Sequence, residues 1–257
     1  GVSILVKNQI GKGIVAGLAA FVLALTLYAS VSATTNLIDD DFEINFGDEA
    51  AVYDTTYYSQ DYSDSTKTAT LNFSAGAGGF KMLTPTDKLL DFTTEGNVNN
   101  YKLNRQDSGT HSEINFEMKN NRIKLGNHNY KNSVEMSLNK NPEWELNFDV
   151  GAASLDLDLT QYIISKIDID MGAAALNIKL GDLAGVTRFK IDAGASDIDI
   201  LIPDSVGCEI KSDAALSSRN YEGFKKVDND LYRSENFDKY PKKIFIEIDC
   251  GVSSIDV

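Results

Sequence analysis

LNFDVGAASLDLDL, residues 146–159, is the stretch that decides the fold, because close copies of it recur at a nearly fixed spacing. The glycines of the first three copies, Gly151, Gly172 and Gly194, are separated by 21 and 22 residues. Self-similarity at such a period indicates a stack of repeated structural units. The later copies are IDIDMGAAALNIKL (167–180), FKIDAGASDIDILI (189–202) and, after a longer interval, IEIDCGVSSIDV (246–257).

Within each copy apolar and polar residues alternate, which is the period of a half-buried β-strand. The apolar positions change parity at the glycine, so that five residues separate Val150 from the next apolar position at Leu155. The apolar side chains of the strands before and after the glycine can both point inward only if the backbone turns a corner, which small residues permit. We therefore predict an all-β fold, a β-solenoid in which Val150, Met171 and Ala193 form one interior column. A sandwich built from hairpins is the alternative.

Weaker copies lie on both sides of this block. LNFSAGAGGFKM (71–82) and INFEMKNNRIKL (114–125) keep the five-residue step, and the Gly-rich residues 76–79 indicate a corner rather than a phosphate-binding loop. CEIKSDAALSS (208–218) is a degenerate copy with Asp213 in the place of the glycine.

The alignment of this degenerate copy makes predictions for two further residues. It places Cys208 level with Leu146 and Phe189, four residues from the level of Cys250, which is about 13 Å along a strand. A disulfide needs Cα atoms within about 7 Å, so two buried free thiols are expected. The same alignment puts Lys211 in the column of Asp149.

An uncharged and mostly apolar segment, residues 13–37, indicates a membrane or secretory signal. About 20 residues of helix suffice to cross the hydrocarbon core. Lys7 and Lys12 precede the segment and acids follow it, so the N-terminus is expected in the cytoplasm. We expect a single-pass cell-membrane protein that contacts lipid through residues 13–33, with its β domain extracytoplasmic. Cleavage after Ala33, which would give a secreted protein, is the alternative.

Charge divides the remainder of the chain. Residues 101–140 hold seven bases and four acids, whereas residues 141–210 hold four bases and thirteen acids, which suggests a boundary near Asn141. The tyrosines before residue 68 are read as part of a loop or stalk over residues 47–70. The predicted organisation is a membrane helix or signal segment (1–36), an acidic Ser/Thr/Tyr-rich connector (37–67), an N-terminal β subdomain (68–141) and a C-terminal repeat solenoid (142–257).

The composition excludes several classes of function. The formal net charge of the 257-residue chain is −14, so nucleic acid, which needs a basic surface, is not an expected partner. Two cysteines and two histidines leave little material for a metal site or for base catalysis. His111 and His128 have no second histidine or cysteine at ligand spacing. No catalytic, cofactor-binding or metal-binding residue is assigned.

Aspartates are the remaining candidates for chemistry. Like charges on successive rungs, about 4.8 Å apart, repel by about 0.9 kcal/mol in bulk water. Calcium could relieve this repulsion, and a solvated acidic face is the alternative. The pairs Asp156/Asp158 and Asp197/Asp199 follow from strand alternation, without the pocket that a glycosidase needs. The acidic column just before the corner consists of Asp149, Asp170, Asp192 and Asp249.

The blocks DVGAASLDLDLT (149–160), DIDMGAAALNIKLGD (168–182) and KIDAGASDIDILIP (190–203) resemble the toast-rack or adhesin-like family of envelope proteins, which includes the C-terminal domains of LiaF-like cell-wall-active antibiotic response proteins. The resemblance covers roughly residues 68–257, with an N-terminal toast-rack-like part up to about residue 141. It implies a membrane-associated β-helical module for envelope sensing, adhesion or scaffolding. LiaF-like proteins usually carry several membrane helices, whereas this chain has at most one.

The expected function is therefore not enzymatic. We expect an envelope scaffold, sensor or adhesin that acts by surface contact with an envelope protein, a glycan or a second copy through the strand edge at residues 255–257. A carbohydrate-active β-helix enzyme is one alternative, against which counts the single arginine, Arg188, in residues 141–210. An accessory regulator of an envelope-stress membrane kinase is the other.

Overall fold

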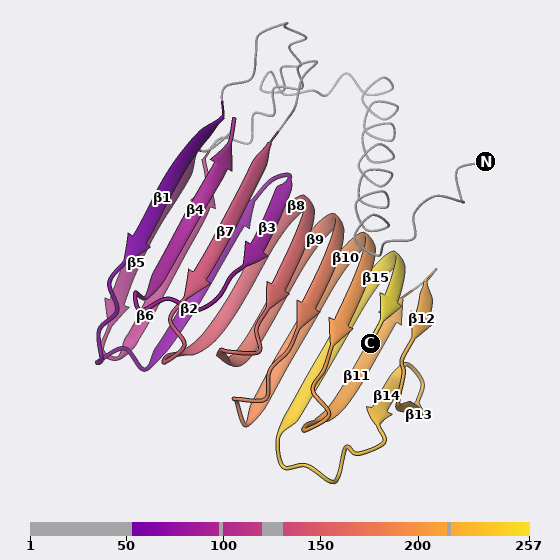
Figure 1. Ribbon diagram of the computed structural model, residues 1–257. Coiled ribbons are helices and arrows are strands. Elements are labelled where there is room, and N and C mark those ends of the chain that lie inside the picture. Colours follow the sequence, from indigo (N-terminus) through magenta and orange to yellow (C-terminus); the bar gives the residue numbers. More distant parts are fainter. Residues whose placement is uncertain (1–52, 98–99, 120–130, 215–216) are drawn as a thin grey trace, which may run out of the picture.

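The structure is a computed structural model that describes residues 53–97, 100–119, 131–214 and 217–257 (Figure 1). Within these ranges the regular structure consists of strands that join in one mixed sheet, so the all-β prediction is confirmed there. The strands are β1 (Asp54–Gln60), β2 (Thr68–Ala75), β3 (Gly78–Met82), β4 (Leu90–Gly96), β5 (Tyr101–Ser108), β6 (His111–Met118), β7 (Asn132–Leu138), β8 (Glu143–Asp158), β9 (Ile163–Lys179), β10 (Val186–Leu201), β11 (Gly207–Ala214), β12 (Ser218–Asn220), β13 (Phe224–Asp228), β14 (Leu231–Ser234) and β15 (Lys243–Asp256).

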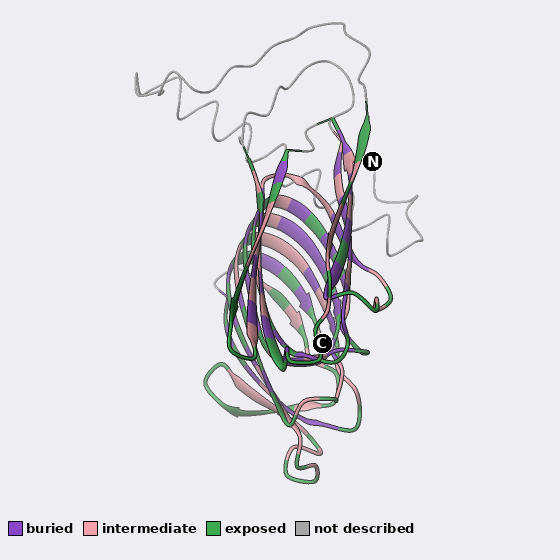
Figure 2. Ribbon diagram, turned by 90° about the vertical axis from the view of Figure 1, so that its left-hand side faces the viewer, coloured by how far each residue is buried: buried purple, intermediate pink, exposed green. Residues whose placement is uncertain are grey.

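Four long parallel strands, β8, β9, β10 and β15, carry the sequence repeat. Each bends at its glycine, so that its two halves belong to two facing layers with the core between them (Figure 2). Val150 pairs with Met171, Met171 with Ala193, and Ala193 with Cys250. The predicted interior column is confirmed, because residues of equal repeat position meet on neighbouring strands.

The weaker upstream copies build further rungs on the same plan. β2 pairs with the first half of β8 and β3 with its second half, while β6 and β7 pair in turn with β2 and β3. Residues 76 and 77 join β2 to β3, which confirms the predicted corner. β5 and β4 form the next rung: β5 pairs antiparallel with β6, and β4 pairs antiparallel with β7. β1 pairs with the other edge of β4 (Figure 1).

The spatial order of the rungs corrects the simple solenoid. β2 and β3 lie between β6/β7 and β8, and the C-terminal strand β15 lies between β10 and β11. Residues 255–257 therefore do not form a free edge: Ile255 pairs with Ile198 on one side and with Arg219 on the other. The Val257 amide donates to the Asn220 carbonyl at 3.0 Å. The last repeat copy thus lies beside β10, and β11 and β12 pair with its other side.

The register predicted for the degenerate copy is also wrong, by two residues. Lys211 pairs with Glu247, and Asp213 rather than Lys211 is level with Asp249. Cys208 is level with Ile244, six residues before Cys250 instead of four. Alternation has a period of two, so a slip of two residues keeps every apolar side chain inward and leaves no trace in the pattern.

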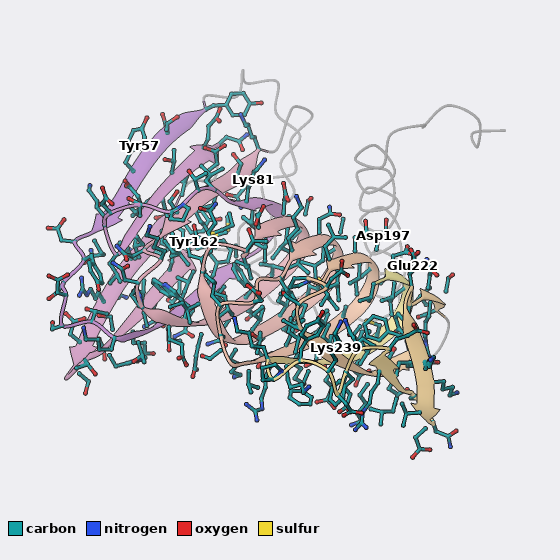
Figure 3. All side chains as sticks on the ribbon, turned by 60° about the horizontal axis from the view of Figure 1, so that its bottom comes forward. Tyr57, Lys81, Tyr162, Asp197, Glu222 and Lys239 are labelled. Carbon is teal, nitrogen blue, oxygen red and sulfur yellow. The ribbon has the colours of Figure 1, made fainter. Side chains whose placement is uncertain are left out.

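The loop or stalk predicted for residues 47–70 needs a correction as well. Its residues 54–60 form β1, which pairs with β4 along its whole length. Tyr58 faces the core, meeting the Phe116 ring edge-on at a centroid distance of 5.0 Å, while Tyr57 points outward and is 74% exposed (Figure 3). Thr and Tyr have high strand propensity, and that propensity prevails here over the polar composition.

One core extends through the described part of the chain. Buried residues from both sides of the predicted boundary at residues 141 and 142 belong to it, so the two predicted subdomains pack as one body. Trp144, just after this boundary, is fully buried and donates its indole N–H to the Asn139 carbonyl at 2.7 Å.

The predicted membrane segment, residues 13–33, and the residue His128 lie outside the described ranges. Within those ranges, no helix has the length and hydrophobicity needed to cross a membrane.

Candidate interaction surface

Five aspartates, four of them exposed and Asp192 half-buried, lie level with one another on the outward face of five adjacent strands, and we call them the aspartate row. They face outward because each alternates with the buried residues of its strand, such as Val150 beside Asp149. Strands in a sheet are about 4.8 Å apart, so the row presents evenly spaced negative charge. In order across β8, β9, β10, β15 and β11, its members are Asp149, Asp170, Asp192, Asp249 and Asp213.

The adjacent outward row, two residues earlier on the same strands, balances its own charge. It runs Asp168, Lys190, Glu247 and Lys211, with the Lys211 ammonium 3.0 Å from the Glu247 carboxylate. Lys190 also pairs with Asp192 of the aspartate row, and this carboxylate raises the pKa of Lys190. The aspartate row is thus locally neutralised at Asp192, and the charge of Asp213 acts on Lys211, whose pKa is raised by Glu247 and, to a smaller extent, by Asp213. Asp149, Asp170 and Asp249 face solvent.

At the level of Asp168, the outward positions of β8, β2, β6 and β5 are asparagines, which we call the asparagine row. The Asn147 amide donates to the Asn72 side-chain oxygen at 2.7 Å, and Asn72 donates to Asn115 at 2.9 Å. Asn104 on β5 pairs with Asn115 and continues the row. Because the amide of Asn72 is held on both sides, glycosylation at the sequon Asn72-Phe73-Ser74 would break the row.

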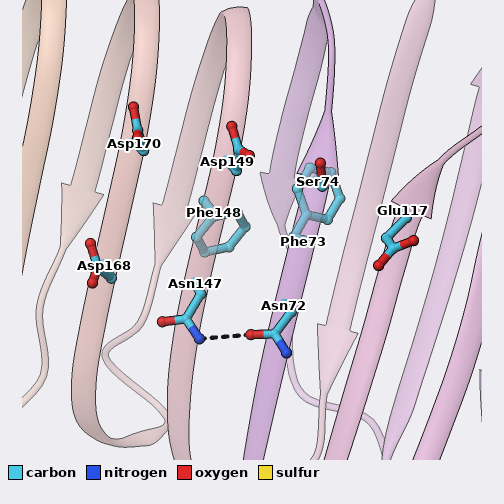
Figure 4. Close-up of a pocket in the computed structure, with 9 residues that line it drawn as sticks. All are labelled: Asn72, Phe73, Ser74, Glu117, Asn147, Phe148, Asp149, Asp168 and Asp170. Atoms are coloured by element: carbon cyan, nitrogen blue, oxygen red, sulfur yellow. Dashed lines mark hydrogen bonds between the residues drawn. The ribbon is translucent and has the colours of Figure 1, made fainter. Parts of the chain in front are cut away.

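A groove of about 330 Å³ lies where the two rows meet, over β6, β2, β8 and β9 (Figure 4). Glu117, Asp149 and Asp170 line it at one level, and Asn72 and Asn147 lie at the level below. Its lining contains no Lys, Arg or His, so a positively charged group would meet the side-chain oxygens of acids, asparagines and Ser74. The groove suits a cationic ligand group and offers no acid–base pair.

The other candidate residues that the structure describes do not line this groove. Asp158 accepts a hydrogen bond from the Thr160 hydroxyl at 2.6 Å, and burial raises the pKa of Asp199, with Asp197 and Asp256 adding to the effect. His111 bonds the Thr68 hydroxyl through Nδ1 at 2.9 Å. Across the described residues, no three His, Cys, Asp or Glu side chains are placed to hold a metal ion.

Both cysteines are buried and free, as predicted. Burial raises the pKa of Cys208 and of Cys250, which keeps both as neutral thiols. Six residues of strand separate their levels, about 20 Å at 3.3 Å per residue, which rules out a bond between them in the folded chain.

We expect neither thiol to react with iodoacetamide at pH 8 while the chain is folded, because the thiolate is the nucleophile. Intact-mass spectrometry should show no adduct on the native chain and two adducts after denaturation. A native adduct, or a crosslink between Cys208 and Cys250 under non-reducing conditions, would contradict the buried positions.

Sequence reasoning missed Asp213 and the whole asparagine row. A signal for the row exists, since LNF at residues 71–73, INF at 114–116 and LNF at 146–148 carry asparagine between two apolar residues. These three segments align side by side on β2, β6 and β8. Asp213 carried no such signal, because nothing in the alternation distinguishes it from Lys211.

The comparisons with known proteins agree with this architecture. A candidate cell adhesion protein from Clostridium sporogenes superposes with a TM-score of 0.74 at 17% identity, over 80% of this chain and 98% of that one. An adhesin candidate from Bacteroides fragilis reaches a TM-score of only 0.33 at 8% identity, over 81% of this chain and 98% of that one. Among curated proteins, none matches the sequence.

The first of these likenesses supports the fold alone, given its low identity, and the second is too weak to carry an argument. The family model of the N-terminal domain of toast_rack, DUF2154, matches residues 45–201, more than half of the chain. The chain therefore belongs to the toast-rack family.

Proposed function

We propose that this protein is a non-enzymatic, membrane-anchored protein of the cell envelope, whose extracytoplasmic β domain acts by surface contact as a scaffold, sensor or adhesin. The observation that carries the proposal is the aspartate row, a line of like charges on rigid, adjacent strands. Support comes from the family. The C. sporogenes protein that shares this fold is itself described as a candidate cell adhesion protein.

The surface has the properties of a binding face more than those of an active site. Catalytic carboxylates need environments that separate their pKa values, whereas the row's members all lie on the outward face of one sheet, outside any enclosed pocket that the structure describes. A partner that carries several positive charges along an extended chain would meet a charge on each successive strand. Such multiple weak contacts give recognition and fast association without a deep pocket.

A matched pair of variants tests this proposal in the full chain. In the first, Asp149, Asp170, Asp192 and Asp249 are replaced by Asn. In the second, the same number of exposed acids outside the row is replaced by the corresponding amides, which gives the same net charge. These control positions are Asp87, Asp91, Asp204 and Glu222.

We expect the row variant to bind a polylysine surface about fivefold or more weakly than the unchanged chain, because exposed charge pairs contribute modestly but add up. The control variant should lose less than half as much affinity for polylysine. The difference in affinity between the two variants should shrink as salt screens the row. Surface plasmon resonance at 50 and 300 mM salt measures both effects. Equal losses in the two variants would mean that net charge alone acts, and would overturn the aspartate row as the binding face.

A further inference from the structure

The interior of the stack becomes more polar at its C-terminal end. At one inward level, phenylalanines and isoleucines are followed by a fully buried serine on β11. At a second level, alanines on β8 and β9 are followed by serines on β10 and β15. The first level runs Phe116, Phe73, Phe148, Ile169, Ile191, Ile248 and Ser212, and the second runs Ala153, Ala174, Ser196 and Ser253. Hydroxyl groups thus replace apolar side chains in the last rungs of the core.

Three aromatic side chains, which we call the aromatic cap, cover this end of the core. They are Tyr221, between β12 and β13, Phe224 of β13 and Tyr232 of β14, all at the end of the stack (Figure 1). The Tyr221 ring centroid lies 4.9 Å from that of Tyr232 and 6.4 Å from that of Phe224. All three side chains are partly buried against the core, and the Tyr221 hydroxyl oxygen is itself buried. The cap therefore brings a polar group into the interior at the same end as the serines.

Four buried hydroxyl groups have no hydrogen-bond partner among the described residues, namely those of Ser196, Ser212, Tyr221 and Ser253. Burial of an unpaired hydroxyl costs free energy, so buried polar groups are nearly always paired, with protein or with ordered water. Burial raises the pKa of Tyr221, and the Ser212 hydroxyl is close enough to oppose that shift. No hydrogen bond joins these two described groups directly, so a small group between them would satisfy both.

We propose that an ordered water molecule binds beneath the aromatic cap and bridges the Tyr221 and Ser212 hydroxyls. Water can donate to one hydroxyl and accept from the other, and a buried polar site needs little more than the volume of one molecule to hold it. A cation fits this site less well, because the positive charge of Arg219 acts on Tyr221 and the unpaired groups include no carboxylate. The bridge ties the aromatic cap, through Tyr221, to β11.

The variant Tyr221→Phe tests the bridge by the sign of its effect on stability. If the hydroxyl bonds to water, its removal should raise the unfolding equilibrium constant about fivefold, the effect of one hydrogen bond. An unpaired buried hydroxyl would give the opposite sign, because its removal ends the cost of burying it. Tyr57→Phe is the matched control, since Tyr57 is 74% exposed, and its effect should stay within about twofold. A gain in stability, or no change, in Tyr221→Phe would overturn the proposal.

A double-mutant cycle with Ser212→Ala tests whether one water serves both hydroxyls. After Tyr221→Phe, the change Ser212→Ala should cost about threefold less than it does in the unchanged chain. Independent effects of the two changes would exclude a shared partner.

A high-resolution crystal structure of the full chain identifies that partner. It should show a water about 2.5–3.0 Å from both hydroxyl oxygens. A direct bond between Tyr221 and Ser212, or a protein group in the position of the water, would equally overturn the proposal.

Discussion

Phe73→Ala is expected to lower the free energy of unfolding by about 3–5 kcal/mol, the range for truncating a buried phenylalanine. Phe73 is 1% exposed and lies at the centre of an aromatic cluster. Its ring centroid is 4.9 Å from that of Phe80, 5.5 Å from Phe148 and 5.9 Å from Phe116. Removal of the ring leaves a cavity that these large side chains, held by neighbouring rungs, cannot fill without moving the strands.

Urea unfolding followed by circular dichroism measures this loss. Tyr57→Ala is the matched control, because it also truncates an aromatic residue of a strand but at an exposed position. Its effect should stay within about 0.5 kcal/mol. If Phe73→Ala cost less than about 1 kcal/mol, the aromatic cluster would not be the packed centre of the upstream rungs.

Much of the fold follows from the sequence alone, and the reason is the repeat. Copies of one pattern at a period of 21 or 22 residues can satisfy their inward positions together only if they stack in register. The column of Val150, Met171 and Ala193 was predictable for that reason. The acidic column was predictable for the same reason, since the residue before each of these is an aspartate.

What the sequence could not determine is the position of elements whose patterns fit in more than one place. The degenerate copy at residues 208–218 fits equally well after a slip of two residues, so the prediction places Lys211 where the structure has Asp213. The insertion of β15 between β10 and β11 depends on the path that the chain takes between β11 and β15. Local alternation carries no information about such non-local order.

The residues of the candidate surface likewise divide into those that the sequence predicts and those that it does not. Its aspartates were found because they occupy equivalent repeat positions. The asparagine row was not found because an amide in a strand is unremarkable until its neighbours are known. Asn72 is informative only beside Asn115 and Asn147, whose side chains bond it directly. Contacts between rungs, more than residue types, define this face.

The glycines at the corners are what allow the rungs to approach one another. Gly76, Gly151, Gly172, Gly194 and Gly251 follow one another through the stack, and the Gly151 amide donates to the Gly76 carbonyl at 3.1 Å. A methyl group at each later position would point at the carbonyl oxygen of the preceding glycine. Whether a corner tolerates alanine therefore depends on the distance from the new Cβ to that oxygen. This distance is 3.4 Å at position 151 but 2.5 Å at position 194.

Gly194→Ala should therefore lower the free energy of unfolding by about 2–3 kcal/mol, the upper part of the range for overpacking. Its new Cβ would lie 2.5 Å from the backbone oxygen of Gly172, which cannot swing aside as a flexible side chain would. Gly79→Ala is the control, because a Cβ there meets nothing within 4 Å and the position also lies in a strand near a corner. That change should leave stability unchanged or raise it by up to about 1 kcal/mol, since alanine restricts the unfolded chain.

Thermal and urea unfolding of both variants, followed in parallel, give the comparison. A loss at Gly194→Ala with none at Gly79→Ala would show that close stacking of the corners, and not the general flexibility of glycine, selects the residue. Gly251→Ala, with a Cβ 2.7 Å from the Gly194 oxygen, should behave like Gly194→Ala, and Gly151→Ala, at 3.4 Å, should be milder than either. If the three losses did not follow this order, the corners would have room to spread, and the glycine period would need another cause.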